Sequence, residues 1–466
     1  MLYTKNDLIA AMEGQIIDQN LKQPLIDEVV IDSRKAAKNK LFIALKGENN
    51  DGHDFLDQAF AEACEAAIIQ DEIFFKNNPD KNLILVKDTF KTLYDLAKFA
   101  RKRTNAKIIA ITGSVGKTGT KEMLKSAFKT QGKTYATSGN LNNHFGLPLT
   151  VCNIPLDSEF AILEMGMNHL GEIEPLTKLA KPDVAIITNI TSAHIGNFKN
   201  EGEIALAKSE IFAGLDNEGI AIINGDNIHF NFLKKQAEKQ NLKPENILSF
   251  GKNLQSQYCL KSLETKDANH SIVELTTKNN GEISYKISSS HKAIIFNSLI
   301  IAACLDLLAK NIADGLKSLE NIEASKGRGN VFDVKIGEKN ITVIDDSYNA
   351  NLASMKAGIE YLSDLKYVLK KKRTVAVLGD MFELGEKSDE IHEEVLGATQ
   401  EKSIDLLLLA GENMKKATKI LDKNFKTYLN SSELSLDIKN CLENDDILLV
   451  KGSRGMKMEE VLQKLS

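Results

Sequence analysis

The chain carries a lysine and a threonine, Lys117 and Thr118, directly after a short glycine loop in the stretch KIIAITGSVGKTGTKEML (107–124). Apolar residues before the loop are typical of a buried strand, and helical spacing resumes after it. Such a strand, loop and helix start can turn backbone N–H groups towards a phosphate at the positive end of the helix. Lys117 adds a positive charge, and Thr118 offers a hydroxyl group suited to a phosphate-bound Mg²⁺. The stretch therefore predicts a nucleotide phosphate site, although Ile111 replaces the first glycine of the general G-x-x-x-x-G-K-T pattern.

Two further polar residues follow apolar runs that are typical of parallel strands. Glu164 ends the run FAILE, where its carboxylate could hold Mg²⁺ beside the loop, and His194 follows the run VAIITNITSA. Ligands of parallel α/β sheets bind beyond the carboxyl ends of the strands, so both residues are candidates for the site. Taken singly, each is also compatible with an ordinary loop or core residue. Lys208, in the helical segment EIALAKSEIF, is on its own typical of a solvent-exposed helix lysine.

Apolar runs and helical segments alternate along the whole chain, which predicts parallel, doubly wound sheets of the α/β class. The length of 466 residues suggests three domains. We predict a small N-terminal α/β domain at 1–104, a central phosphate-loop domain with a mostly parallel sheet at 105–325, and a C-terminal Rossmann-like domain at 326–466. Within the central domain, the polar segment 252–290 is typical of a small antiparallel insertion.

Composition argues against several classes of function. The net charge is -5 and both signs are interspersed along the chain, so nothing indicates nucleic-acid binding. The chain has neither a run of about 18 apolar residues nor a basic leader followed by an apolar segment, which predicts a soluble cytoplasmic protein. The cysteines lie singly in mostly apolar surroundings and indicate reduced thiols. The chain has no G-x-G-x-x-G loop, which argues against a nicotinamide cofactor.

Polar residues also cluster near strand ends in the first and last parts of the chain. Asp346 follows the run ITVI, where an acidic side chain could hold ribose hydroxyls or cap a helix. Lys451 and Ser453 follow the run ILLV, which suggests contact with an anion or a substrate. Ser33 and Arg34 lie between two strand-like runs and could line a ligand site, although polar loops of this kind are usually solvent-exposed turns.

A set of motifs in a fixed order carries a resemblance to a known family. The chain resembles the Mur ligases of peptidoglycan synthesis through TGSVGKTGTK, GNLNNHFGLPLT, LEMGMNHLGEI, ITNITSAHIGNF, AKSEIF, GRGN, DDSYNAN, LGDMFELGE and LVKGSRGMKME. The resemblance covers nearly the whole chain, and DDSYNAN and LGDMFELGE favour the members that add D-alanyl-D-alanine to UDP-N-acetylmuramoyl-tripeptide. It implies an ATP-dependent cytoplasmic ligase that activates the tripeptide carboxylate as an acyl phosphate, with release of ADP, before the dipeptide amine attacks. We expect the protein to be a monomer, although the sequence does not determine its oligomeric state. The N-terminal domain would bind the UDP-sugar, the central domain ATP, and the C-terminal domain would contribute to ATP and D-alanyl-D-alanine binding.

The resemblance also implies roles for individual residues. ATP would contact Gly113, Ser114, Val115, Gly116, Lys117, Thr118, Asn297 on the adenine side, Arg328 at the phosphates and Asp346 at the ribose. Two Mg²⁺ ions would be held by Thr118, Glu164, His194 and Lys208, with Lys208 carbamylated by CO₂. The catalytic residues would be Lys117, His194 and Lys208. The UDP end would contact Ser33 and Arg34, the muramoyl group Asn142 and Asn143, and the peptide substrates Lys451 and Ser453.

Other functions are compatible with parts of this pattern. A Mur-type ligase that adds the third amino acid is the alternative within the family, but the DNPR motif expected of it is absent. An ATPase switch without ligase activity would give no reason for His194 and Lys208, and a pure binding protein would not need both the phosphate loop and the metal ligands. Two positions depart from the family pattern: Leu352 replaces a proline, and His291 lies further upstream of Asn297 than usual, which leaves its role open.

Overall fold

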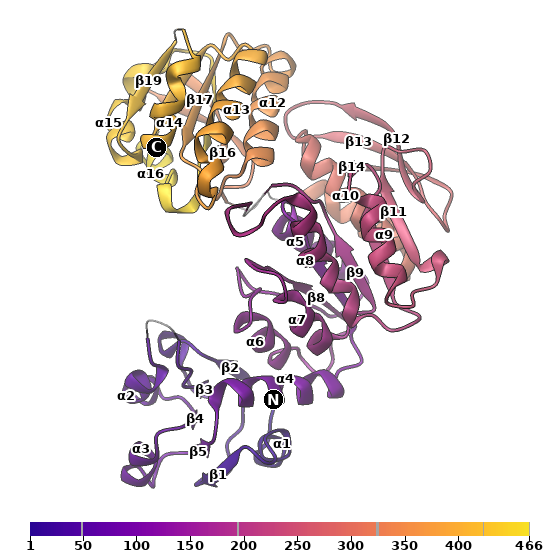
Figure 1. The fold of residues 1–466 in the computed structure, drawn as a ribbon, viewed down its shortest axis with the longest axis vertical. Coiled ribbons are helices and arrows are strands. Elements are labelled where there is room, and N and C mark those ends of the chain that lie inside the picture. Colours follow the sequence, from indigo (N-terminus) through magenta and orange to yellow (C-terminus); the bar gives the residue numbers. More distant parts are fainter. Residues whose placement is uncertain (48–49, 193–194, 323–325, 423, 466) are drawn as a thin grey trace.

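The computed structural model describes residues 1–47, 50–192, 195–322, 326–422 and 424–465. Within these ranges the strands form three separate sheets, which follow one another along the chain and along the long axis of the molecule (Figure 1). This mixed α/β architecture of an N-terminal, a central and a C-terminal unit confirms the predicted fold class. The sheets span residues 16–86, 107–287 and 330–451, while the domain boundaries at 104 and 325 stay predictions.

The N-terminal unit is a small sheet covered by helices. Its strands lie in the order β1-β5-β4-β3-β2, and all neighbours are parallel except β1 and β5. The strands are β1 (Ile16–Gln19), β2 (Glu28–Val30), β3 (Lys40–Ile43), β4 (Ala66–Ile69) and β5 (Leu83–Val86). The helices are α1 (Lys5–Ala11), α2 (Leu56–Ala61), α3 (Glu72–Asn77) and α4 (Thr89–Arg103). Helix α4 packs against α6 (Gly146–Cys152) of the central unit and so joins the two units.

The central unit is built on a sheet in the order β14-β13-β12-β11-β10-β9-β6-β8-β7. Its strands are β6 (Lys107–Thr112), β7 (Thr134–Ala136), β8 (Phe160–Glu164), β9 (Val184–Ile187), β10 (Ile220–Asn224), β11 (Ile247–Gly251), β12 (Tyr258–Thr265), β13 (Ser271–Thr276) and β14 (Glu282–Ile287). Its helices are α5 (Lys117–Lys129), α6 (Gly146–Cys152), α7 (Ile173–Ala180), α8 (Glu201–Ser209), α9 (Phe230–Glu238), α10 (Lys292–Leu308) and α11 (Ile312–Lys317). From β7 to β11 all neighbours are parallel, as expected where helices connect successive strands.

The segment 252–290 contains antiparallel strands, as predicted, and these strands extend the central sheet. Strand β12 pairs in parallel with β11 through two residue pairs, and β12, β13 and β14 then run antiparallel to one another. The alternation of polar and apolar residues indicates antiparallel strands. A parallel contact as short as that between β11 and β12 leaves no pattern in the sequence, so the attachment to the central sheet was not foreseen.

The C-terminal unit contains a sheet in the order β15-β16-β20-β17-β18-β19, which is parallel except for the hairpin of β15 and β16. Its strands are β15 (Asn330–Ile336), β16 (Lys339–Asp346), β17 (Arg373–Gly379), β18 (Leu406–Ala410), β19 (Phe425–Tyr428) and β20 (Asp446–Lys451). Its helices are α12 (Leu352–Val368), α13 (Ser388–Glu401), α14 (Glu412–Ala417), α15 (Ser431–Cys441) and α16 (Glu459–Leu465). The alternation of parallel strands and helices agrees with the expected Rossmann-like unit.

The inner parallel strands of the central unit, such as β8 and β9, are buried on both faces. In β6, Ile109 and Ile111 pack with apolar side chains of α5 and α10, whereas Ile108 and Ala110 pack with those of α6 and α7. Parallel strands covered by helices on both faces are continuous apolar runs, which is the pattern of this sequence. The loops at the carboxyl ends of these strands therefore rest on a closely packed support. None of the described helices is long and apolar enough to cross a membrane.

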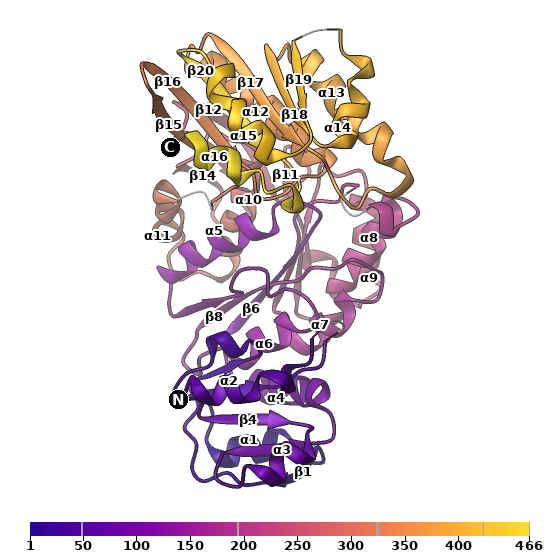
Figure 2. The ribbon, with the colours of Figure 1, turned by 90° about the vertical axis from the view of Figure 1, so that its left-hand side faces the viewer.

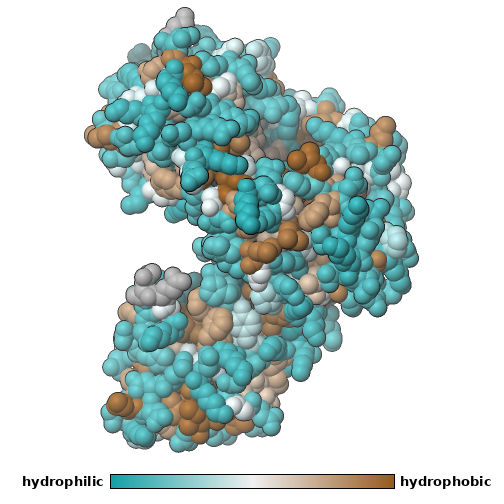
Figure 3. Space-filling model, in the orientation of Figure 1, coloured by the Kyte–Doolittle hydropathy of each residue, from teal (hydrophilic) through white to brown (hydrophobic). Residues whose placement is uncertain are grey.

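A deep notch separates the N-terminal unit from the C-terminal unit on one side of the molecule (Figure 3). The central unit lies between the two along the long axis, as the view at right angles also shows (Figure 2). The central and C-terminal units are in direct contact, for example through the 3.1 Å hydrogen bond from the Gly196 N–H to the Glu383 carbonyl.

Candidate functional site

The glycine loop between β6 and α5 has the geometry of an anion site. Gly113 and Gly116 have φ values of 151° and 88°, and Gly116 is the N-cap residue of α5. A Cβ atom at Gly113 would lie 1.9 Å from Thr188 Oγ1, so only glycine fits there. The first backbone N–H groups of a helix have no acceptor within their own helix, so the start of α5 can bind an anion.

The loop is held in place by residues that follow β9. The Ser114 hydroxyl donates to the Thr191 carbonyl at 3.0 Å and accepts from the Thr191 N–H at 3.0 Å. The Thr188 hydroxyl donates to the Val115 carbonyl at 2.6 Å. Sequence reasoning missed both threonines, and their position just after a strand was the only available signal. Ser114 and Val115, both predicted to contact ATP, lie in the loop. In this structure the Ser114 hydroxyl and the Val115 carbonyl bind the residues that follow β9.

Lys117 folds back over the loop that precedes it. Its ammonium donates to the Gly113 carbonyl at 2.6 Å. Burial lowers the pKa of Lys117, the Glu164 carboxylate opposes this shift, and the Arg328 guanidinium adds to it. Arg328 belongs to the segment just before β15, so a charge of the C-terminal unit acts on Lys117.

Glu164 lies at the end of β8, opposite Ile111 of the neighbouring strand β6, and this register puts its carboxylate beside the loop. Oε1 accepts hydrogen bonds from Asn142 Nδ2 at 2.9 Å and from the Thr118 hydroxyl at 3.4 Å. Oε2 is buried and has no hydrogen-bond partner among the described residues. Thr118 and Glu164, predicted to hold one metal ion, are therefore adjacent in the structure, and Asn142, predicted to contact the muramoyl group, lies beside them.

These oxygen atoms fit a magnesium ion. Mg²⁺ prefers oxygen ligands and is usually held by one or two carboxylates together with phosphate oxygens and water. The Thr118 hydroxyl and the open Glu164 oxygen are such ligands, and they lie at the phosphate loop. In the part of the chain that the structure describes, no group of three or more His, Cys, Asp or Glu side chains could hold a metal ion by itself. The site therefore suits a metal that arrives with phosphate.

A buried lysine that the sequence analysis did not single out also faces Glu164. The Lys121 ammonium lies 3.8 Å from Glu164 Oε2 and 3.1 Å from Glu122 Oε1, and it donates to the Gly139 carbonyl at 3.4 Å. Its side chain is fully buried. One signal was available, because Lys117 and Lys121 are four residues apart and so lie on the same helix face.

Lys208 lies in α8 and is almost completely buried. The structure therefore excludes the solvent-exposed helix lysine that the isolated segment suggests. Burial, reinforced by the charge of Lys117, lowers the pKa of Lys208 well below its usual value, and no described carboxylate opposes this shift. His194, predicted to share a metal ion with Lys208, lies outside the described residues.

Asn297 and Arg328, both predicted to contact ATP, belong to two other segments of the chain. A Cβ atom at Gly116 would lie 2.6 Å from Asn297 Nδ2, so the amide of this α10 residue lies against the loop. The Arg328 guanidinium lies over the Tyr348 ring, 4.2 Å from its centroid, and the Arg454 guanidinium is 5.4 Å from the same centroid. Such cation–π contacts can hold both arginines beside Tyr348.

Asp346 and Lys451, for which different ligands were predicted, form one ion pair. They lie opposite each other on the neighbouring strands β16 and β20. The Lys451 ammonium donates to Asp346 Oδ2 at 2.6 Å and to the Asn349 carbonyl at 3.1 Å. The Ser453 hydroxyl accepts a hydrogen bond from the Phe382 N–H at 2.9 Å. Lys451 and Ser453 thus support their own unit, and their contacts with peptide substrates stay predictions.

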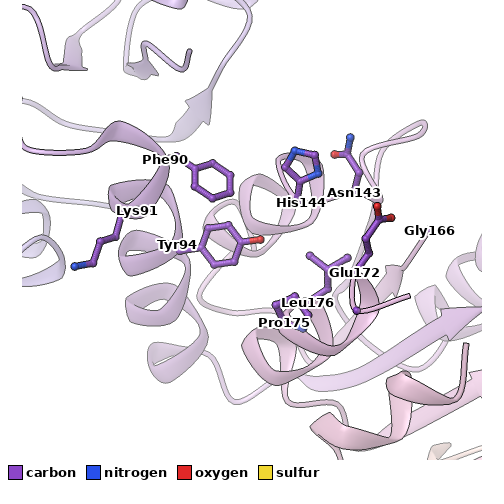
Figure 4. Close-up of a pocket in the computed structure, with 10 residues that line it drawn as sticks. Phe90, Lys91, Tyr94, Asn143, His144, Gly166, Glu172, Pro175 and Leu176 are labelled. Carbon is purple, nitrogen blue, oxygen red and sulfur yellow. The ribbon is translucent and has the colours of Figure 1, made fainter. Parts of the chain in front are cut away.

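Asn143 lies where the N-terminal and central units meet. Its Oδ1 accepts hydrogen bonds from two backbone N–H groups at the start of α6, at 3.2 and 2.9 Å. It also lines a cavity of about 540 Å³ between α4 and α7 (Figure 4). The rings of Phe90, Tyr94 and His144 lie along one side of this cavity, and Glu172 lies along another (Figure 4).

Ser33 and Arg34 lie in the short turn η1 (Ser33–Lys35) of the N-terminal unit. The Ser33 hydroxyl donates to Gln58 Oε1 at 2.9 Å. The exposed Arg34 guanidinium donates to both carboxylate oxygens of Asp32, at 2.9 and 2.8 Å. These contacts stay within the N-terminal unit, so the structure does not bring the predicted UDP-binding residues to the phosphate loop.

Sequence models of one family match three consecutive parts of the chain. The model described as Mur ligase family, catalytic domain, matches residues 25–100. The Mur ligase middle domain matches residues 111–305, and the model described as Mur ligase, glutamate ligase domain, matches residues 327–454.

Curated relatives and solved structures agree with these matches. The UDP-N-acetylmuramoyl-tripeptide--D-alanyl-D-alanine ligase of Rickettsia prowazekii is 36% identical, and the alignment covers 94% of each chain. The Bacillus subtilis protein of the same name is 33% identical over 99% of this chain and 98% of its own. A crystal structure of MurF from Acinetobacter baumannii superposes with a TM-score of 0.85 at 29% identity, covering 99% of this chain and 98% of that one. MurF ligase from Thermotoga maritima in complex with ADP gives 0.78 at 28% identity, covering 96% and 98%.

Proposed function

The chain belongs to the Mur ligase family, and we infer that it is an ATP-dependent ligase that joins D-alanyl-D-alanine to UDP-N-acetylmuramoyl-tripeptide. The products would be UDP-N-acetylmuramoyl-pentapeptide, a peptidoglycan precursor made in the cytoplasm, with ADP and phosphate. The observation that carries the proposal is the grouping around Glu164, where a phosphate loop, an open carboxylate oxygen and buried lysines come together. An enzyme that brings two anions into contact needs such an excess of positive charge.

In the proposed reaction, a carboxylate oxygen of the tripeptide attacks the γ-phosphorus of ATP, and ADP leaves as an acyl phosphate forms. The dipeptide amine then attacks the activated carbonyl carbon and loses a proton, and phosphate leaves as the C–O bond breaks. Lys117, which donates to the Gly113 carbonyl in this structure, would turn its ammonium to the phosphate oxygens of ATP. Arg328 would approach the same oxygens from the C-terminal unit.

Thr118 and Glu164 would hold a magnesium ion at the phosphates of ATP, which their positions at the loop support. When bound, Mg²⁺ neutralises charge on the phosphate oxygens and so lowers the barrier for an approaching carboxylate. A second ion would be held by Lys208 together with His194, which lies outside the described residues.

For this second site, we propose that Lys208 is carbamylated. Its amine nitrogen would attack the carbon of CO₂, a proton would leave to solvent, and the new N–C bond would create an anionic oxygen ligand. The support is that the side chain is buried without an acidic partner among the described residues, while the Lys117 cation lies nearby. Carbamylation would replace the repulsion between the two lysines by attraction.

The remaining parts of the chain fit the same reaction. The N-terminal unit would hold the UDP end at Ser33 and Arg34, and the muramoyl group would extend past Asn142 and Asn143 across the notch. Asn297 would contact the adenine and Asp346 the ribose of ATP, while Lys451 and Ser453 would contact the peptide substrates. All these residues belong to a single chain, so the proposed site needs no second subunit.

The test is phosphate release from ATP in the presence of UDP-N-acetylmuramoyl-tripeptide, measured with and without D-alanyl-D-alanine. We expect release to depend on the dipeptide, and mass spectrometry should detect the pentapeptide product. Stimulation by a free amino acid instead would indicate the ligase that adds the third residue. Hydrolysis that no acceptor stimulates would indicate an ATPase switch, and either result would contradict the proposal.

A further inference from the structure

Lys121 is a buried cation that the proposed reaction does not use. It lies one helical turn beyond Lys117 in α5, and its side chain is fully buried. Its ammonium lies 3.1 Å from Glu122 Oε1 and donates to the Gly139 carbonyl at 3.4 Å. These two contacts hold the ammonium in a fixed direction, towards the end of β8.

The oxygen that Lys121 faces is the one left open on Glu164. Oε1 of Glu164 is occupied by hydrogen bonds from Asn142 and Thr118. Oε2 has no hydrogen-bond partner among the described residues, and the Lys121 ammonium is 3.8 Å away. A cation that binds Oε2 must therefore come within a few ångströms of an existing positive charge.

We propose that Lys121 is a built-in counter-cation of Glu164, which keeps free divalent metal out of the site until a nucleotide brings its phosphates. The proposal rests on the proposed function only through the assignment of Glu164 as a metal ligand. Without nucleotide, the positive charges of Lys121 and Lys117 lie near a single buried carboxylate. With nucleotide, the phosphate charges offset them and the metal can enter as part of a neutralised complex.

The size of the effect follows from Coulomb's law. Removing one charge near a bound divalent ion, with the screening typical of protein sites, should tighten metal binding by at least about tenfold. Because the phosphate charges offset this repulsion, the gain in metal affinity should be smaller when nucleotide is bound. Metal and nucleotide binding are thermodynamically linked, so loss of Lys121 should also weaken their mutual enhancement.

The experiment measures Mn²⁺ binding to the full-length protein by the electron paramagnetic resonance signal of free Mn²⁺, with and without ADP. The neutral variants Lys121→Met and Lys121→Gln should bind Mn²⁺ at least about tenfold more tightly than the wild type without ADP. With ADP the difference should shrink. Two variants of different shape separate the effect of charge from that of packing, and the assay needs no turnover.

Lys125→Met is the matched control. Lys125 lies one turn further along α5 and pairs with the same Glu122 at 3.9 Å, but it makes no ion pair with Glu164 in the described structure. It should bind Mn²⁺ like the wild type. Glu164→Gln, introduced into the Lys121→Met protein, should abolish the gain.

Two results would overturn the proposal. Mn²⁺ affinity within twofold of the wild type in both Lys121 variants would mean that the ammonium does not oppose metal binding. Weaker binding in both, with and without ADP, would mean that Lys121 only holds Glu164 in position. Failure of the ligase assay is a separate result, because a difference in Mn²⁺ affinity can be measured whichever acceptor the enzyme uses.

Discussion

Lys208 in the central unit and Lys451 in the C-terminal unit are equally buried, with 1% and 2% of their surfaces exposed, but their surroundings differ. The Lys451 ammonium donates to the Asp346 carboxylate and to the Asn349 carbonyl. Lys208 has no ion-pair partner among the described acidic residues, and the charge that acts on it is the ammonium of Lys117.

We interpret this difference as one between a lysine that supports the fold and a lysine that is proposed to bind a ligand. A buried charge without a partner destabilises the folded state, whereas a buried ion pair loses much of its stability when one partner is removed. Lys451 fixes Asp346 at the end of β16, so the C-terminal unit has balanced charges there. Around the phosphate loop, the described cations Lys117, Lys121 and Lys208 still outnumber the carboxylates of Glu164 and Glu122. Excess charge of this kind marks the place where phosphates are expected to bind.

The largest effect is expected for Lys208→Ala. This change should lower dipeptide-dependent phosphate release on the order of a thousandfold, because charge stabilisation by a metal site contributes several kcal/mol. The free energy of unfolding should change little, because removal of an unpaired buried charge offsets the cavity that the shorter side chain leaves. Added short carboxylic acids should restore part of the activity by supplying the missing oxygen. Kinetic assays measure the rate of phosphate release, and urea unfolding of the same preparation measures the free energy of unfolding.

Lys235→Ala is the control for this prediction. Lys235 is an exposed lysine in the neighbouring helix α9, and its loss should change neither rate nor stability. Full activity of Lys208→Ala would remove the carbamate role. A large loss of stability would show that Lys208 supports the fold as Lys451 does, and it would contradict the proposed difference between the two lysines.

The next largest effect concerns stability and Lys451. Lys451→Met should lower the free energy of unfolding by about 3 kcal/mol, because it leaves Asp346 without its partner in a largely buried position. The double variant with Asp346→Asn should recover part of this loss, since no unpaired charge remains. Urea unfolding of the single and double variants measures the coupling. Equal stability losses for Lys451→Met and Lys208→Met would contradict the distinction between the two lysines.

The parallel strands and the phosphate loop could be predicted because short stretches of sequence are typical of them. Strands β8 and β9 are continuous apolar runs, as expected where parallel strands are buried on both faces, and the loop after β6 has the composition of a phosphate site. The position of Glu164 beside the loop could be predicted for the same reason, because this residue ends such an apolar run. These features depend on neighbours in the sequence, which a pattern can contain.

The pairing of side chains could not be predicted in this way. Lys451 meets Asp346 only because β20 lies beside β16 in a particular register, although the two residues are 105 positions apart. Thr188 supports the phosphate loop, and Lys121 faces Glu164, through packing between separate elements. Contacts between residues so far apart in the sequence leave no local pattern, so only the structure shows which residues support the site.

The contact between the central and C-terminal units can be tested at Gly196. A Cβ atom there would lie 2.7 Å from the Glu383 carbonyl oxygen and 3.0 Å from the Gly385 nitrogen, and neither backbone atom can turn away. Gly196→Ala should therefore shift the C-terminal unit and lower kcat/KM roughly tenfold, because small displacements of reacting groups are costly. Gly397→Ala, whose Cβ would meet nothing within 4 Å, is the matched control. Unchanged kinetics in Gly196→Ala would mean that this contact does not position the units for catalysis.

The smallest effect is expected where the two units meet at His291. Its Nδ1 accepts a hydrogen bond from the Ala293 N–H at the start of α10, and its ring lies 4.4 Å from that of Tyr361 in α12. Burial lowers the pKa of His291; the charges of Asp346 and Glu360 oppose this shift, and Lys451 adds to it. Below the unfolded pKa of about 6.5, the unfolded chain therefore binds a proton that the folded protein resists, and stability falls as the pH decreases. His291→Asn keeps a residue suited to the N-cap and removes this titration, so between pH 6.5 and 5 it should lose less stability than the wild type. Urea unfolding across this range measures the difference, and parallel curves for the two proteins would show that His291 titrates alike in both states.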